Sequence, residues 1–239
     1  MTPGDLGRTA ALVPAAGRGE RLGPGAPKAL RPLGGIPMLV HAVRALAASR
    51  VVDLVVVAAP EDDVEAVTSM LADQEFSAEV VVVTGGPTRQ DSVARALLGL
   101  PDDVDVVLVH DAARPLVPAE VVGSVVSAVR SGHPAVVPGL PVVDTIKQVD
   151  AACDVERTVD RESLRAIQTP QGFDRAVLQR AHAAADLDAV ATDDAGLVER
   201  LGTRVHVVPG HEEAFKVTTP LDVVIAEAIL ARRRAAGAV

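Results

Sequence analysis

The sequence of 239 residues contains no tryptophan, no tyrosine and only three phenylalanines. Proteins that bind single-stranded nucleic acid rely on aromatic side chains on which bases stack, and this chain lacks such platforms. It also carries 23 basic against 32 acidic residues, a net charge of −9, which repels polyanions. Both features argue against nucleic acid as a partner, while a small anion could bind wherever basic groups gather.

Cysteine is nearly absent as well, because Cys153 is the only one. A single cysteine excludes an intrachain disulfide and a thiolate metal cluster, as is typical of proteins in a reducing compartment. No apolar run reaches the roughly 18 residues that a membrane helix needs. The N-terminal apolar piece is short and is cut by Pro14 and Gly17, which does not fit a signal peptide. We therefore expect a cytoplasmic protein without a membrane partner.

Short valine-rich runs alternate along the chain with segments of helical periodicity. We expect strands at residues 11–13, 51–59, 80–83, 104–109, 135–137 and 205–208. The first five of these runs are rich in valine and predict buried parallel strands. We expect helices at residues 38–48, 61–71, 91–100, 118–130, 175–185, 194–201 and 221–233. This alternation predicts an α/β fold, a Rossmann-like, doubly wound, mostly parallel sheet with helices on both faces. The length suits a single domain over residues 1–239.

Residues 139–168 break this alternation. Polar and apolar residues follow one another there, a pattern typical of exposed antiparallel strands. The segment is too long for an ordinary loop of a compact domain. We therefore expect a β-arm that protrudes from the main sheet.

A glycine-rich loop, PAAGRGERLGPGAPK at residues 14–28, directly follows the first expected strand. In such sheets, ligands bind beside the loop that leaves the carboxyl end of a strand. Glycines let backbone N–H groups approach phosphate oxygens, and Arg18, Arg21 and Lys28 supply opposing charge. The spacing matches neither the dinucleotide fingerprint nor a Walker loop. The loop predicts a phosphate cradle; the alternative is a flexible loop with solvated arginines.

Two more polar loops follow expected strands. In HDAARP at residues 110–115, Asp111 could orient a metal-bound phosphate or a substrate hydroxyl, and Arg114 could bind phosphate through its planar guanidinium. Alternatively, Asp111 caps a turn and Arg114 is solvated. In GGPTRQDS at residues 85–92, the glycines permit close backbone approach, whereas Asp91 or Ser92 could simply begin a helix.

Lys216 is one of only three lysines and precedes a helix start that does not need it. Histidines and carboxylates form no spacing typical of a metal centre, so we expect no metal site built by the protein itself.

Taken together, these motifs resemble the 2-C-methyl-D-erythritol 4-phosphate cytidylyltransferase family, nucleotidyltransferases of the non-mevalonate isoprenoid pathway. The motifs that carry the resemblance span almost the whole chain and occur in the order PAAGRGERLG…PK, GG…R-x-DSV, VHDAARP, DTIK, TPQGF, TDDA and FKVTT. The resemblance implies that CTP and 2-C-methyl-D-erythritol 4-phosphate are joined to give 4-diphosphocytidyl-2-C-methyl-D-erythritol and pyrophosphate. It also implies attack of the acceptor phosphate on the α-phosphorus, with Mg²⁺ carried by the CTP phosphates.

The resemblance also assigns residues. CTP would be held by Pro14, Ala15, Ala16, Gly17, Gly19, Gly86, Ser92 and Ala112. Catalytic charge would come from Arg21, Lys28 and Lys216. The acceptor would be held by Asp111, Arg114, Thr145, Arg161, Thr169 and Thr192.

Thr145 and Arg161 fall on the expected arm, which in the family reaches into the other subunit of a homodimer, so the resemblance implies a shared active site. Pro87 departs from the family, which often has an acidic or polar residue there, because proline offers neither a side-chain acceptor nor an N–H. Two alternatives stay open. One is a cytidylyltransferase for another polyol phosphate such as ribitol 5-phosphate. The other is a non-catalytic nucleotide-binding regulator, which would not need Arg114 and Lys216 at a second phosphate subsite.

Overall fold

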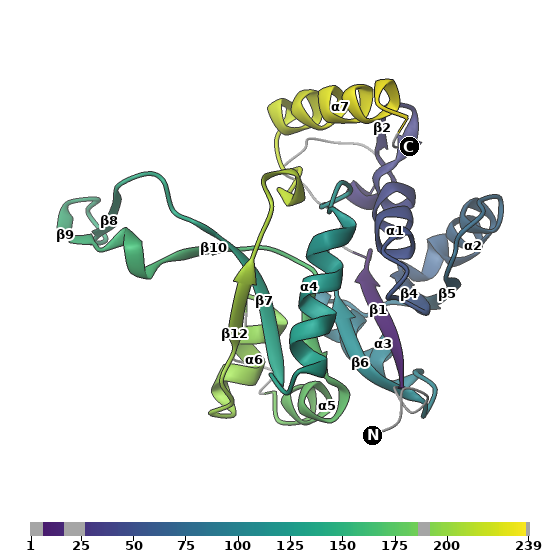
Figure 1. Cartoon of the computed structure of the whole chain (residues 1–239), viewed down its shortest axis with the longest axis horizontal. Coiled ribbons are helices and arrows are strands. Elements are labelled where there is room, and N and C mark those ends of the chain that lie inside the picture. The colour runs from purple at the N-terminus through teal and green to yellow at the C-terminus, as the bar shows by residue number, and fades with distance from the viewer. Residues whose placement is uncertain (1–6, 17–26, 186–191, 238–239) are drawn as a thin grey trace.

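The computed structural model describes residues 7–16, 27–185 and 192–237, and its centre is a twisted sheet in the order β10-β7-β11-β6-β1-β4-β5, with β12 paired to β7 (Figure 1). The strands of this sheet are β1 (Arg8–Pro14), β4 (Leu54–Ala59), β5 (Glu79–Thr84), β6 (Val104–Val109), β7 (Ala135–Pro141), β10 (Arg165–Ile167), β11 (Gln171–Asp174) and β12 (His206–Pro209). Strands β6, β1, β4 and β5 are parallel neighbours, and β12 is parallel to β7. Strand β11 runs antiparallel between β6 and β7. The sheet is therefore mixed and mostly parallel, which confirms the predicted α/β class.

Helices cover both faces of this sheet. They are α1 (Met38–Ala48), α2 (Val64–Ala72), α3 (Arg89–Leu98), α4 (Ala119–Arg130), α5 (Arg175–Ala183), α6 (Asp194–Arg200) and α7 (Pro220–Ala235). Alternate residues of β1 point to opposite faces: Ala11 lies in a buried cluster with residues of α1, α2 and α4, and Leu12 lies in one with residues of α3, α5 and α6. The fully buried valine runs of the central strands thus have helices on both sides, as such sheets require.

Short elements complete the chain. They are the 3-10 helices η2 (Lys28–Leu30), η3 (Glu61–Asp63), η4 (Arg161–Ser163) and η5 (Glu212–Ala214), and the strands β2 (Pro32–Leu33) and β3 (Ile36–Pro37). Helix α7 lies across one end of the molecule, beyond α1 and α4 (Figure 1). Among the described helices, none is long and apolar enough to cross a bilayer.

Strand β5 differs from the prediction of a buried strand. Its residues are exposed or half-buried, because it forms the end of the sheet path beside β4. The predicted strand at residues 51–59 begins only at Leu54, and Asp53 instead accepts a hydrogen bond from the Thr9 N–H at 2.8 Å. An edge strand has one neighbour instead of two, which the sequence of the strand does not record.

The segment between β7 and β10 leaves the main sheet. Strands β8 (Ile146–Val149) and β9 (Val155–Val159) pair antiparallel in a ribbon that projects from the rest of the molecule (Figure 1). At its base, Arg165 pairs with Pro141 across β10 and β7. Apolar side chains on this arm are exposed, among them Val143 at 80% and Val155 at 59%. The antiparallel strands expected in this segment are thus present.

Parallel strands place the loops that follow them at one end of the sheet. The loops after β1, β5 and β6 meet there, and the antiparallel β11 begins at the same end, because Gln171 lies opposite Val109. The sites predicted from separate motifs therefore come together in space.

Candidate active site

A pocket of about 210 Å³ lies at the carboxyl ends of β1 and β6. Its lining includes Pro14, Ala15, Ala16, Lys28, Gly86, Ser92, Ala112 and Lys216, all of which were predicted as nucleotide-binding or catalytic residues. Gly17, Gly19 and Arg21, predicted for the same site, lie outside the described residues. The three loops predicted to bind a nucleotide thus share one cavity, which we call the first pocket.

The loop after β5 is built around a glycine. A Cβ atom on Gly86 would lie 2.2 Å from the Cβ of Asp91, so no other residue fits there without a shift of the backbone. The Gly86 N–H donates to the Ser92 hydroxyl at 3.0 Å, and that hydroxyl donates to the Thr88 carbonyl at 2.9 Å. Thr88 caps α3 in a capping box with Asp91. The helix therefore begins at Arg89, earlier than predicted, and Ser92 holds the loop instead of starting the helix.

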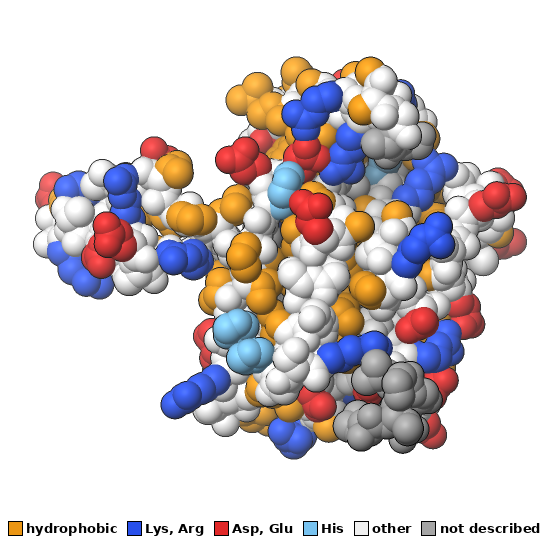
Figure 2. Space-filling view, viewed as in Figure 1, with side chains coloured by type: hydrophobic (Ala, Val, Ile, Leu, Met, Phe, Trp, Pro, Cys, Tyr) orange, Lys and Arg blue, Asp and Glu red, His pale blue; other side chains and the backbone are white. Residues whose placement is uncertain are grey.

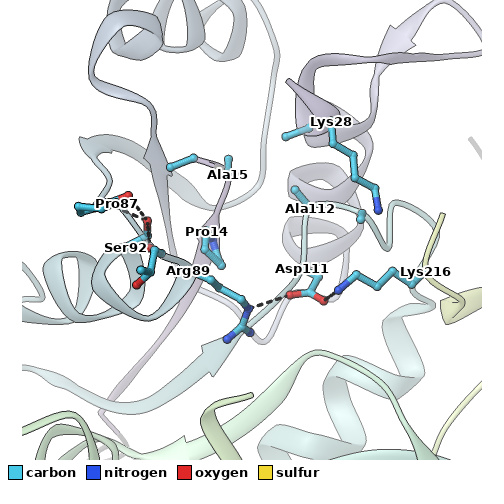
Figure 3. A pocket seen from close by; sticks show the side chains of 14 residues that line it. Pro14, Ala15, Lys28, Pro87, Arg89, Ser92, Asp111, Ala112 and Lys216 are labelled. Atoms are coloured by element: carbon cyan, nitrogen blue, oxygen red, sulfur yellow. Dashed lines mark hydrogen bonds and ion pairs between the residues drawn. The ribbon is translucent and has the colours of Figure 1, made fainter. Parts of the chain in front are cut away.

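Asp111 is the charged centre of the site. Its Oδ2 accepts from Lys216 Nζ at 2.7 Å and its Oδ1 accepts from Arg89 Nε at 3.2 Å (Figure 3). Burial alone would raise the pKa of Asp111, but the charges of Arg89 and Lys216 outweigh it and hold the pKa well below its ordinary value. Asp111 is therefore an anion at neutral pH and accepts hydrogen bonds without exchanging protons.

The first pocket is cationic although the chain is acidic, and the space-filling view shows basic and acidic side chains interspersed over the outer surface (Figure 2). The Lys28 side chain reaches from η2 toward the Asp111–Lys216 pair (Figure 3). In the described part of the lining, Lys28 and Lys216 add positive charge beside Asp111, whereas the charge of Arg89 is taken up by two carboxylates, Asp111 and Asp194. Such a local excess of positive charge attracts a multiply charged anion. The cavity fits a ligand that carries phosphates.

A second pocket of about 200 Å³ shares Arg89, Asp111 and Lys216 with the first. Its other lining residues include Arg114, Gln168, Thr169, Gln171, Thr192 and Asp193. Four residues predicted to hold the acceptor, namely Asp111, Arg114, Thr169 and Thr192, thus border one cavity. Because the pockets share a wall, a ligand in each would meet at the Arg89–Asp111–Lys216 group.

His110, which the motif analysis did not assign, organises this wall. The Asp111 N–H donates to Thr169 Oγ1 at 3.0 Å, and Thr169 Oγ1 lies 3.1 Å from His110 Nδ1. His110 Nε2 lies 3.1 Å from the Arg114 carbonyl, which can only accept, so we assign the proton to Nε2. Complete burial lowers the pKa of His110 to about 4. The imidazole is therefore neutral and links the loop after β6 to Thr169.

Arg114 ties three segments together. Its guanidinium donates to the Ala214 carbonyl at 2.7 Å and to the Ile167 carbonyl at 3.3 Å. Its Nε is buried and has no hydrogen-bond partner among the described residues. Burial lowers the pKa of Arg114, although an arginine stays protonated in proteins. A buried donor without a partner is costly, and it belongs to a residue that lines the second pocket described above.

Lys216 is placed by the segment that precedes α7. The Val217 N–H donates to the Ala113 carbonyl at 2.8 Å, which fixes this segment against the loop after β6. Farther along, Arg233 donates to the Leu116 carbonyl at 2.8 Å and pairs with Glu213. Helix α7 thereby anchors the chain on both sides of the lysine.

Arg89 is a second residue that the sequence analysis did not assign. Besides Asp111, its guanidinium donates to Asp194 Oδ2 at 2.6 Å. The two carboxylates lie 22 and 105 positions away along the chain. In the sequence, only the position of Arg89 between the glycine pair and an expected helix could have indicated a role for it. That position does not predict which carboxylates it binds.

Thr145 and Arg161 line neither pocket of their own chain. Thr145 is exposed on the arm. Arg161 donates to the Val143 carbonyl and borders a separate cavity of about 430 Å³ at the base of the arm. Within one chain, these two predicted acceptor residues do not join the site.

Comparison with known proteins agrees with the geometry. The sequence pattern of the IspD family, 2-C-methyl-D-erythritol 4-phosphate cytidylyltransferase, matches residues 9–232. The chain is 61% identical over 235 residues to the 2-C-methyl-D-erythritol 4-phosphate cytidylyltransferase of Streptomyces coelicolor, covering 95% of this chain and 86% of that protein.

Solved structures agree as well. The crystal structure of the enzyme of the same name from Thermus thermophilus superposes with a TM-score of 0.74 at 41% identity, covering 94% of this chain and 99% of that one. The 4-diphosphocytidyl-2C-methyl-D-erythritol synthase from Anaerococcus prevotii superposes with a TM-score of 0.82 at 27% identity, covering 95% and 100%. The chain therefore belongs to the 2-C-methyl-D-erythritol 4-phosphate cytidylyltransferase family.

Proposed function

We propose that the first pocket holds CTP and the second holds 2-C-methyl-D-erythritol 4-phosphate, with the reacting groups meeting at the Arg89–Asp111–Lys216 wall. As a member of its family, the chain is an enzyme, a cytidylyltransferase that joins these two substrates into 4-diphosphocytidyl-2-C-methyl-D-erythritol and pyrophosphate in isoprenoid biosynthesis. The observation that carries the assignment is the pair of adjoining pockets that share these charged residues. Two anionic substrates need such a place to approach each other.

The proposed chemistry is an in-line displacement. An oxygen of the acceptor phosphate attacks the α-phosphorus, the bond from that phosphorus to the bridging oxygen breaks, and pyrophosphate leaves with the electron pair. A phosphate monoester has a second pKa near ~6 and is largely dianionic at neutral pH, so no general base is needed. The site agrees with this, because Asp111 is locked as an anion and His110 is buried and neutral.

Charge stabilisation is then the main task of the protein. Negative charge grows on the five-coordinate phosphorus, and Lys28 and Lys216 lie in the lining of the first pocket where they can neutralise it. Arg21 has the same role by resemblance. Holding both substrates in line adds the benefit of proximity.

CTP is proposed to bind as its Mg²⁺ complex, with the ion carried by the substrate phosphates. Within the described residues, no group of three or more histidine, cysteine or carboxylate side chains could hold a metal ion. Asp111, the carboxylate in the described part of the lining, is already engaged by two cations. The ion would supply further charge neutralisation on the triphosphate.

We further propose a homodimer in which the arm of one subunit completes the acceptor pocket of the other. Two observations support this. Thr145 directly precedes β8 and Arg161 begins η4 shortly after β9, so both belong to the arm whose β8–β9 ribbon projects from the molecule (Figure 1). Apolar side chains of the arm, such as Val143, are exposed. Exposed strands of this kind need a partner. We propose that the arm, at about residues 139–168, is part of a single domain that spans residues 1–239. We also propose that the protein is cytoplasmic, because a chain with a single cysteine is typical of a reducing compartment.

The test is CTP-dependent pyrophosphate release with a panel of acceptors. We expect the highest kcat/KM with 2-C-methyl-D-erythritol 4-phosphate and little turnover with ribitol 5-phosphate. A higher kcat/KM with ribitol 5-phosphate would assign the second pocket to that acceptor instead. Tight binding of CTP without turnover of any acceptor would identify a nucleotide-binding regulator.

A further inference from the structure

The Arg89 guanidinium lies between two buried carboxylates. It donates through Nε to Asp111 at 3.2 Å and through Nη1 to Asp194 at 2.6 Å. The side chains of Asp111 and Asp194 are only 13% and 1% exposed. A carboxylate buried so deeply needs a cation beside it. Arg89 supplies that charge to both carboxylates. Its planar guanidinium can donate to two partners at once, which the compact ammonium group of a lysine does less well.

Asp194 connects Arg89 to the second pocket. It is the first residue of α6 and directly follows Thr192 and Asp193, both of which line that pocket. Its second oxygen, Oδ1, lies 3.0 Å from His182 Nε2. Burial would raise the pKa of Asp194, but the His182 hydrogen bond and the Arg89 charge lower it. The start of α6 is thus anchored through Asp194 and also through the Gln171 side chain, which donates to Asp193 Oδ2 at 2.7 Å and accepts from the Ala195 N–H at 3.1 Å. The placement of Thr192 depends on these anchors, of which Asp194 is the one that Arg89 holds.

The loop after β5, which lines the first pocket, is held in place by groups other than the Arg89 guanidinium. The Gly86 N–H is fixed by Ser92, and Thr88 and Asp91 cap α3 reciprocally. None of these bonds uses the Arg89 guanidinium. Loss of that guanidinium should therefore leave the backbone of the first pocket in place.

We propose that Arg89 is a positioning residue for the acceptor: it holds the Asp111 carboxylate and the start of α6 in fixed relation, and so shapes the second pocket. This inference rests on the proposed assignment of that pocket to the polyol phosphate. It predicts an effect on one substrate only, whereas a purely structural arginine would affect stability without distinguishing the substrates.

The experiment compares Arg89→Met and Arg89→Lys with the wild-type enzyme. Steady-state kinetics with 2-C-methyl-D-erythritol 4-phosphate give kcat and KM, and calorimetry without acceptor gives the Kd for Mg²⁺-CTP. We expect Arg89→Met to raise the acceptor KM at least tenfold and to change the CTP Kd less than threefold. Arg89→Lys keeps the charge and should recover part of the lost acceptor affinity.

Arg175→Met is the matched control. Arg175 is also a partly buried arginine at a helix start, and it donates to backbone carbonyls near the other end of β6. Arg175→Met should lower the melting temperature without changing the acceptor KM. If Arg89→Met does not fold, Asp194→Asn removes the far end of the same bridge and must show the same split between the substrates.

The proposal is overturned if the acceptor KM rises less than fivefold in the folded variant, or if the CTP Kd rises by the same factor as that KM. Either result is distinct from failure of the proposed function, which would appear as a wild-type enzyme that does not turn over this acceptor at all.

Discussion

Lowering the pH should destabilise the protein through His110, a residue buried completely beside the active site. Its pKa is about 4 in the folded chain, against an ordinary value of 6.5. Between these two values the unfolded chain binds a proton that the folded chain does not. The stability due to neutral His110 is therefore fully present above the unfolded pKa and is lost as the pH falls toward the folded pKa. From about pH 7.5 to about pH 5, this linkage amounts to about 2 kcal/mol.

The assay is urea unfolding of the wild type and His110→Gln at both pH values and constant ionic strength. Circular dichroism is the suitable probe, since the chain has no tryptophan or tyrosine. The variant should be less stable at neutral pH, but its unfolding free energy should fall by about 2 kcal/mol less over the interval. Burial lowers the pKa of His41 too, and its contribution is common to both proteins. An equal pH dependence in the two proteins would refute the neutral, buried assignment of His110.

Three further predictions concern the active site. Lys28→Ala and Lys216→Ala should each lower kcat by two or more powers of ten, because each removes charge worth ~3 to 4 kcal/mol in the transition state. The control is Arg8→Ala, which removes an ion-paired basic side chain about as exposed as that of Lys216 from the other end of the sheet. Near-normal turnover in either folded lysine variant would contradict the assignment. Arg114→Ala should raise the acceptor KM and leave calorimetric CTP binding nearly unchanged; loss of CTP affinity alone would mean that the two pockets are reversed. Inactive Arg161→Ala and Lys28→Ala subunits, mixed in equal amounts, should recover about a quarter of the wild-type rate, because about half of the dimers then carry one intact site of two. Continued inactivity despite verified subunit exchange, or a monomer at assay concentration, would exclude the shared site.

Much of the fold follows from local patterns in the sequence. Helix α1 has the predicted bounds, and β6 has the predicted bounds as well. Both predictions depend on the spacing of apolar residues within the segment itself, which can be seen in the sequence without knowledge of the fold. The rule that ligands bind at the carboxyl ends of parallel strands also put the motifs after β1, β5 and β6 in one place, and the pocket linings agree.

Tertiary pairing decided what those patterns do not contain. The sequence analysis did not predict β11, a strand of four residues between β6 and β7. Ile167 lies opposite Gly139 and Gly172 lies opposite Val136, so residues 168–171 occupy a space that spans only two residues of β7. This irregularity brings Thr169 to the Asp111 N–H. Register of this kind depends on neighbouring strands, not on the composition of the strand itself.

The charged centre shows the same division. The sequence by itself determined that cations and carboxylates would gather at one end of the sheet. Only the tertiary structure decided which of them pair: Lys216 and Asp194 each meet a partner 105 positions away, and Arg89 joins the two pockets through Asp111. An ion pair in a buried site is selected by distance and desolvation, and neither quantity exists until the chain has folded.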